Sequence, residues 1–163
     1  MHGASSWSFG EREAQRIHDI LRELLRESGA RSALLVDRTG QLVAQAGEAP
    51  TFDPTAFASL TAADFSANDQ LARMLGEQEF GALFHQGERE SMYLADVVRR
   101  VILVVLFDNR TTLGLVKLRV RGTVGTLGEV FTAMFAPGAQ PPPRMADGFV
   151  GEAEDELDRL FGE

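Results

Sequence analysis

Apolar side chains recur every three or four residues in three segments of the chain, which predicts three amphipathic helices. The first helix is expected to follow Ser8, which stands three residues before Glu11 in the spacing of a capping box, and to end near Gly29. The third helix follows a cap at Thr111 or Thr112. Its apolar face steps by three or four residues throughout and consists of Leu113, Val116, Val120, Val124, Leu127, Phe131 and Met134.

The middle helix is predicted to begin with Asp53 as its N-cap and Pro54 in its first turn, and to end near Gly76. We expect its buried side to consist of Phe57, Leu60, Phe65, Leu71, Met74 and Leu75. The remaining side chains are mostly small or polar, so another backbone is able to approach this helix closely. Two interpretations remain open: this side is a contact surface for a partner, or it is an ordinary solvated helix face.

Five short segments carry the signals of β-strands. Residues 32–37 and 41–46 flank a tight turn, which predicts a β-hairpin. Residues 79–85 and 91–98 alternate partly between apolar and polar side chains. Residues 101–107 are continuously apolar and rich in β-branched side chains, as expected of a strand that is covered on both faces. This last strand should therefore lie in the middle of the sheet.

The predicted element order is α-β-β-α-β-β-β-α. This order defines an α/β (α+β) domain in which helices cover both faces of a five-stranded, mainly antiparallel sheet. We place the domain at residues 8–135, a proline-rich linker at 136–148 and an acidic amphipathic tail helix at 149–163. A helix this short is marginal alone in water, so it needs a groove, either on its own domain or dimer mate or on another protein. The proline-rich separation and the net acidity favour another protein.

Three glycines of the third helix have the spacing GxxGxxG, which resembles a phosphate-binding loop: Gly122, Gly125 and Gly128. Such loops need their glycines in the turn between a strand and a helix, where backbone N–H groups face the anion. These glycines fall inside the predicted helix, which argues against phosphate binding. Because an interior glycine destabilises a helix by about 0.5–1 kcal/mol, we expect them and Gly114 to pack closely against the sheet or the first helix.

The composition of the 163 residues narrows the classes of protein. A net charge of −8 argues against nucleic acid as a partner, because phosphate binding needs clustered Lys and Arg. The absence of cysteine excludes disulfides, thiolate metal sites and cysteine nucleophiles. The apolar run at 101–107 is too short to span a bilayer, and residues 1–10 lack the pattern of a signal peptide. We therefore expect a soluble, cytoplasmic protein without membrane insertion.

No group of side chains has the spacing of a catalytic or metal-binding site. The histidines fall on three different elements and form no metal-binding pair: His2, His18 and His85. The carboxylates around the fourth predicted strand are expected to be solvated surface charges: Glu88, Glu90 and Asp96. No nucleophile with an adjacent base is recognisable. We therefore predict a protein that is not an enzyme and that binds no cofactor or metal.

Four segments resemble the roadblock/dynein light chain family, and specifically its bacterial MglB branch: "LLVDRTGQLVAQAG", "SLTAADFSANDQLARMLGEQEF", "HQGERESMYL" and "VVLFDNRTTLGLVKLRV". The resemblance covers about residues 12–135 and the acidic tail with "DELDRLF". It is most specific in "FDNRTTLGLVKL" and in the strand-to-glycine loop "FHQGE", since the first hairpin is shared widely by the superfamily.

The resemblance implies a homodimer in which the third strands pair and the middle helices lie side by side. The strand residues in question are Phe80, Ala82 and Phe84. It also implies that the dimer binds a small Ras-like GTPase of the MglA type, stimulates GTP hydrolysis by orienting the GTPase's own catalytic residues, and acts in bacterial cell polarity and motility. The implied location is the cytoplasm, including a cell pole.

The resemblance further assigns contact residues for the GTPase. On the middle helix they centre on Ala62, Ala63, Ser66 and Gln70, with Ala67 and Arg73 at the edge. Where relatives have mostly alanine and glycine, this helix has the bulkier residues Asp64, Phe65, Asn68, Asp69 and Gln70. Bulkier side chains oppose a close approach of the GTPase to the helix. The tail is expected to make a second contact through Leu157, Leu160 and Phe161. Three alternatives remain: a passive adaptor, a factor that acts in nucleotide exchange through its tail, and a small-molecule sensor of related topology.

Overall fold

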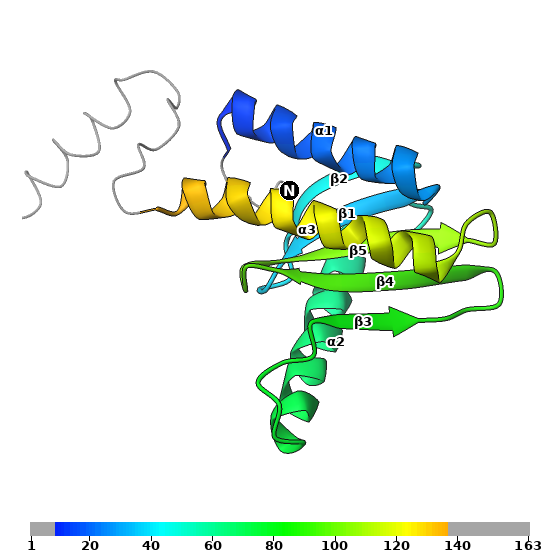
Figure 1. Cartoon of the computed structure of the whole chain (residues 1–163), viewed down its shortest axis with the longest axis vertical. Coiled ribbons are helices and arrows are strands. Elements are labelled where there is room, and N and C mark those ends of the chain that lie inside the picture. The colour runs from blue at the N-terminus through cyan, green and yellow to red at the C-terminus, as the bar shows by residue number, and fades with distance from the viewer. Residues whose placement is uncertain (1–8, 137–163) are drawn as a thin grey trace, which may run out of the picture.

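One five-stranded sheet with helices on both faces makes up the computed structural model of the chain, which describes residues 9–136 (Figure 1). In chain order the elements are α1 (Glu11–Ser28), β1 (Ser32–Asp37), β2 (Leu42–Gly47), α2 (Pro54–Met74), β3 (Ala82–His85), β4 (Glu90–Val97), β5 (Val101–Asp108) and α3 (Leu113–Met134). The predicted order of helices and strands is thereby confirmed. The predicted tail helix and nearly all of the predicted linker lie outside the described residues.

The strands are arranged in the order β2-β1-β5-β4-β3, and all four neighbouring pairs are antiparallel. The continuously apolar strand β5 lies in the centre, as predicted, and is buried along almost its whole length. Its neighbours β1 and β4 separate it from the two edges. The edge strands β2 and β3 are each paired on one side within the described residues.

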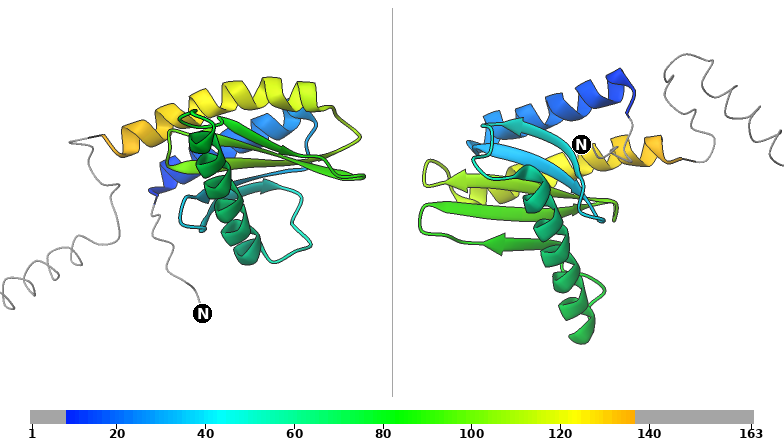
Figure 2. Two further views of the ribbon diagram at one scale, coloured as in Figure 1. Left: turned by 90° about the horizontal axis from the view of Figure 1, so that it is seen from below. Right: turned by 180° about the vertical axis from the view of Figure 1, so that it is seen from behind.

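Two hydrophobic cores lie on opposite faces of the sheet. Helices α1 and α3 cover one face, and α2 covers the other (Figures 1 and 2). Alternate residues of each strand belong to different cores: on β1, Leu35 packs towards α1 and α3, whereas Leu34 and Val36 pack towards α2. Helix α2 crosses the strands, and its C-terminal part projects beyond β3 at the edge of the sheet (Figures 1 and 2).

Helix α1 begins later than its sequence pattern predicted. Its N-cap is Gly10, which makes no side-chain cap, and Glu11 is the first helical residue. Ser8, the predicted cap, lies outside the described residues. The carboxylate of Glu11 therefore lies in the first turn, where the positive end of the helix dipole stabilises it, and not at the third position of a capping box. The predicted end is confirmed, since Gly29 adopts φ 73° at the C-cap.

Side-chain caps start the other two helices where the sequence placed them. The backbone N–H of Thr55 donates to the carboxylate of Asp53 at 3.0 Å, and Pro54 occupies the first turn of α2. The N–H of Leu115 donates to the Thr112 hydroxyl at 3.2 Å. Each cap satisfies one N–H that has no partner inside its helix.

The glycines of α3 contradict the prediction that they pack closely. A Cβ atom at Gly114, Gly122 or Gly125 would meet no atom within 4 Å, whereas one at Gly128 would lie 3.2 Å from Val98. The predicted apolar face of α3 does cover the sheet, with Val116 and its helical neighbours buried. The first three glycines therefore lie on the opposite, solvent-facing side of the same helix.

The described part of the chain contains no membrane-spanning helix: none of its helices is both long and apolar enough to cross a bilayer.

Candidate protein interface

The residues that α2 buries against the sheet are mostly small. They are Ala58, Thr61, Ala62, Phe65, Asn68 and Ala72, and their spacing of three or four residues marks one helical face. Phe65 is the only large apolar side chain in this set. Small side chains allow the helix backbone to lie close to the strands, where Phe65 packs among leucine, valine and isoleucine side chains of the sheet.

The large apolar side chains of α2 lie on its solvent side. The prediction that they are buried is therefore wrong for four of six residues: Leu60 is 71% exposed, Leu71 56%, Met74 82% and Leu75 74%. Phe57 is partly buried and Phe65 is fully buried. We call Leu60, Ala63, Ala67, Leu71 and Met74 the outer stripe of α2, since steps of three or four residues join them along one face opposite the sheet.

The contact residues predicted on α2 separate into buried and exposed positions. Ala62 is only 8% exposed and belongs to the core under α2, so it offers little surface to a partner. The other five are exposed: Ala63, Ser66, Ala67, Gln70 and Arg73. Ser66, Gln70 and Arg73 follow one another at steps of four and three residues and form a polar flank beside the outer stripe.

Most of the bulkier residues of α2 lie away from the predicted GTPase contact surface, so they do not obstruct it. Phe65 and Asn68 are buried towards the sheet. Asp69 accepts a hydrogen bond from Arg38 at 2.8 Å, and Asp64 contacts His85 at 2.6 Å. Of the bulkier set, Gln70 alone belongs to the exposed positions of the predicted contact surface.

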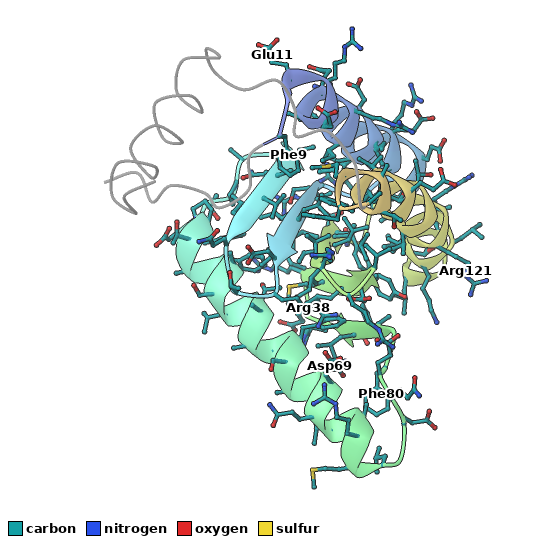
Figure 3. All side chains as sticks on the ribbon, turned by 90° about the vertical axis from the view of Figure 1, so that its left-hand side faces the viewer. Phe9, Glu11, Arg38, Asp69, Phe80 and Arg121 are labelled. Atoms are coloured by element: carbon teal, nitrogen blue, oxygen red, sulfur yellow. The ribbon has the colours of Figure 1, made fainter. Side chains whose placement is uncertain are left out.

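Arg38, which sequence patterns did not single out, ties α2 to the sheet. It lies in the turn between β1 and β2 and pairs with Asp69 of α2 and with Asp96 of β4. Its guanidinium also stacks over the ring of Phe65, 4.9 Å from the centroid. Figure 3 shows Arg38 and Asp69 in the space between α2 and the strands. In the sequence, only its two acidic partners mark Arg38 as a contact between elements. They are far apart along the chain, so their spacing does not reveal the pairing.

The side of α2 that faces β3 is marked by the contact between the carboxylate of Asp64 and Nε2 of His85. Leu71 and Leu75 follow Asp64 by seven and eleven residues, which are close to two and three full turns, so they lie on the same side. The polar flank lies on the other side, near the β1–β2 hairpin, because Arg73 follows the Arg38-bound Asp69 by one turn. The two flanks of α2 thus differ in chemistry.

Strand β3 leaves its outer edge unpaired within residues 9–136. Of the three predicted dimer residues, Ala82 and Phe84 lie in the strand and pack into the core under α1 and α3. The ring of Phe84 stacks on Phe107 at a centroid distance of 6.1 Å. Phe80 precedes the strand, because β3 begins only at Ala82. The strand offers its backbone to a partner, while its side chains hold it to the sheet.

A charged cluster at one end of the sheet joins several loops. Arg31 forms ion pairs with Glu48, Glu90 and Asp108, and its hydrogen bond lowers the pKa of Glu48 below the usual value. Hydrogen bonds from the side chain and backbone of Arg110 likewise lower the pKa of Asp108. Glu90, one of the predicted solvated carboxylates, thus has a cationic partner. The cluster is a structural joint between the ends of the strands and the start of α3.

The described residues contain no group of three or more His, Asp or Glu side chains arranged to hold a metal ion. The features that could bind a partner are the exposed apolar side chains of α2 and the unpaired backbone edge of β3 beside it. A small α/β domain whose exposed apolar stripe lies next to an unpaired sheet edge is a protein-interaction module.

Comparison with known proteins identifies the family. The sequence profile of the Roadblock/LC7 domain matches residues 16–107. The chain is 42% identical to Myxococcus xanthus MglB over 72% of its own length and 96% of that chain, with a TM-score of 0.70. The gliding protein MglB of Thermus thermophilus is 35% identical over 77% of this chain and 95% of that one, with a TM-score of 0.71. The chain therefore belongs to the Roadblock/LC7 family, in its MglB branch.

Two further comparisons bear on how far the likeness extends. A Roadblock/LC7 domain from Streptomyces avermitilis shares the fold at 13% identity, with 71% of this chain and 97% of that chain covered and a TM-score of 0.64. No curated protein sequence matches the chain. The family is one of regulatory domains.

Proposed function

We propose that this protein is a homodimeric activator of a small Ras-like GTPase of the MglA type and that it acts in bacterial cell polarity and motility. The observation that carries this proposal is the outer stripe of α2, which exposes Leu60, Leu71 and Met74 on a helix that projects past the sheet edge. Exposed apolar side chains arranged contiguously mark contact sites for other proteins.

The β3 side of α2 is the proposed dimer contact. The strand edge and the flank with Leu71 and Leu75 lie on the same side of the molecule, next to the Asp64–His85 contact. If two β3 strands pair, the sheets become continuous and the projecting parts of the two α2 helices come to lie side by side. Burying an exposed leucine contributes about 1.5–3 kcal/mol, so these two side chains supply much of the dimer affinity.

The polar flank of α2 is the proposed GTPase contact, formed by Ser66, Gln70 and Arg73 together with Ala63 and Ala67 of the outer stripe. Small side chains at 63 and 67 let a second backbone approach, and the polar flank supplies hydrogen bonds at the rim. The tail residues Leu157, Leu160 and Phe161 are proposed as a second GTPase contact.

Stimulation of hydrolysis requires no catalytic group from this chain. Phosphoryl transfer depends mainly on positioning and on electrostatic stabilisation of the transferred group. A partner that holds the GTPase's own arginine and glutamine in place lowers the barrier without inserting a side chain of its own. A rigid helix held to its sheet by Arg38 and Phe65 is suited to that role.

The direct test is single-turnover GTP hydrolysis by an MglA-type GTPase, with and without a saturating amount of this protein. We expect acceleration of about tenfold or more, which corresponds to about 1.4 kcal/mol. Binding without acceleration contradicts activation and leaves the passive adaptor, or a role in nucleotide exchange. Absence of binding contradicts the proposed partner.

Two substitutions test the proposed surface. Ser66→Arg and Gln70→Arg place a large cation on the polar flank and should abolish GTPase binding, while the dimer stays intact by analytical ultracentrifugation. Gln15→Arg is the matched control, because Gln15 is an exposed residue on α1, on the other face of the sheet. Retention of binding in both α2 variants shows that the contact lies elsewhere.

A further inference from the structure

Helix α3 presents an outer face that no described part of the chain covers. Leu118 is 61% exposed and Leu115 is 37% exposed, although the opposite face of this helix is packed into the core. Gly122 and Gly125 continue the same face by one and two turns beyond Leu118, and no described atom lies near their Cβ positions. We call Leu115, Leu118, Gly122 and Gly125 the outer face of α3.

The glycines of this face lower the stability of the helix, and no contact within residues 9–136 compensates for that loss. An interior helix glycine is about 0.5–1 kcal/mol less stable than alanine, and neither Gly122 nor Gly125 adopts a backbone conformation that requires glycine. The missing side chains create space for another segment to lie directly on the helix backbone. Two exposed leucines beside that space supply apolar area for the same contact.

Basic side chains line both flanks of the outer face. Lys117 and Arg121, four residues apart, lie on one flank, and Arg119 lies on the other, where it reaches Glu27 of α1 at 3.6 Å. Arg121 extends outwards from α3 in Figure 3. A segment that combines apolar residues with acidic neighbours on both sides complements this arrangement.

We propose that residues 149–163 of the same chain dock on the outer face of α3. This segment has apolar residues at helical spacing, ending in Leu157, Leu160 and Phe161. The segment contains one basic residue, Arg159. Six acidic residues surround the apolar ones: Glu152, Glu154, Asp155, Glu156, Asp158 and Glu163. The apolar residues cover Leu115 and Leu118 and approach the glycines, while the carboxylates face the flanking cations.

The length of chain after α3 permits this contact. Residues 137–148 number twelve, and such a stretch spans about 20 Å as a coil and about 37 Å when extended. From Met134 back to Gly122 is twelve residues of helix, or about 18 Å. The tethered segment therefore reaches the outer face at an effective concentration on the order of millimolar, which allows even a weak helix to bind.

Docking covers the same apolar residues that a foreign partner of the tail would use. The inference stands without the proposed GTPase function, because it concerns contacts within one chain. In the absence of a partner, the tail is docked on α3. A partner therefore has to displace it before it binds Leu157, Leu160 and Phe161. Affinity for such a partner is then reduced by the fraction of tail that is docked.

Amide hydrogen exchange of the full-length protein tests the proposal. We expect amides in residues 150–161 to exchange about tenfold or more slowly than in an unstructured peptide, at a level that does not change as dilution converts the dimer into monomers. Lys117→Glu combined with Arg121→Glu should remove this protection. Adding Glu154→Lys and Asp158→Lys to that variant should restore it, because the charges are exchanged across the same contact.

The matched control is Arg22→Glu with Arg26→Glu, which makes the same change in charge on the side of α1 that lies near Gly47, the last residue of β2, and the following Glu48. Tail protection should survive in this control. Unprotected tail amides in the wild-type chain, equal protection in the Lys117 and Arg121 variant, or protection that rises with protein concentration would each overturn the proposal. The last result assigns the tail to a second copy of the chain.

Gly125→Leu separates docking from helix stability. Leucine is a better helix former than glycine and meets no described atom at its Cβ position, so the urea midpoint of the domain should rise. The added side chain fills the space that the tail occupies, so tail protection should fall in the same variant. A rise in both quantities contradicts docking on the outer face of α3.

Discussion

Helices α2 and α3 are nearly equal in length, begin with equivalent side-chain caps and cover opposite faces of one sheet, yet they distribute their side chains in opposite ways. Helix α3 buries large residues such as Leu127 and Phe131 and exposes glycines. Helix α2 buries alanines such as Ala58 and Ala72 and exposes leucines. Helix α3 uses most of its large apolar residues to stabilise the domain, and α2 presents most of its own to solvent.

The comparison shows that an apolar helical period identifies a contact face without identifying what covers that face. On α3 the period marks the side against the sheet. On α2 the residues that satisfy the same period are mainly those available to a partner, while small residues lie against the strands. Stability and association should therefore respond to different helices, and substitutions on each helix test this separation.

The largest expected effect is a core truncation on α3. Phe131→Ala should lower the free energy of unfolding by about 3–5 kcal/mol, because it leaves a cavity at a fully buried position. Met74→Ala on α2 removes a side chain that is 82% exposed and should change monomer stability by less than about 0.5 kcal/mol. Urea unfolding at a concentration where the protein is monomeric measures both. Comparable losses would show that α2 stabilises the domain in the same way as α3.

The next effect concerns association. Leu71→Asp combined with Leu75→Asp should weaken the dimer by about 3 kcal/mol or more, roughly a hundredfold or greater rise in Kd, since two leucines lose their burial. Sedimentation equilibrium gives the constant, and circular dichroism should show an unchanged fold. The control is Gln15→Asp on α1. An unaltered dimer would move the interface away from the β3 side of α2.

A smaller effect of opposite sign is expected at the exposed glycines. Gly122→Ala should stabilise the domain by about 0.5–1 kcal/mol, because alanine is favoured in helices and its Cβ meets no described atom. Ala67→Gly on the exposed side of α2 should destabilise the domain by a similar amount. Urea midpoints measure both changes. Equal and opposite shifts show that helix propensity alone decides both changes, whereas a smaller gain at Gly122 shows that alanine also weakens the docked tail.

The smallest effect depends on pH. Arg31 lowers the pKa of Glu48 in the folded protein, so this carboxylate adds stability above about pH 4, the ordinary pKa of a carboxyl, and the contribution is lost as pH falls through the folded value. Glu48→Gln should therefore be less stable than wild type at neutral pH, and the difference should shrink as the pH falls and Glu48 becomes protonated in the folded protein. The Phe131→Ala penalty should stay constant over this range. Urea titrations at each pH measure both.

The sequence predicted the architecture well because the architecture depends on local signals. The run at 101–107 identified the central strand. Asp53, and Thr111 or Thr112, identified two helix starts from capping chemistry that acts over three residues. The start of α1 was misplaced because its N-cap is Gly10, which has no side chain to cap the helix. A start of this kind leaves no capping signal in the sequence.

The candidate interface was predictable only in part, because burial is decided by distant parts of the chain. Leu60 and Leu71 have the spacing of core residues, and only the path of α2 across the sheet shows that they remain outside. Arg38 was missed since its partners Asp69 and Asp96 are brought together by three different elements. Ala62 was assigned to the surface by resemblance, whereas the structure places it in the core.

The projecting end of α2 has a consequence for local order. Beyond Asp69, which pairs with Arg38, Ala72 is the only fully buried side chain of this helix, so its last turn is held by few contacts apart from its own hydrogen bonds. Segments of that kind open at low free-energy cost. In the monomer, the backbone after Arg73 should then be open to trypsin, and a bound partner, including a second copy of the chain, should protect it. Limited proteolysis thus reports occupancy of α2 in a cell extract without any label on the protein.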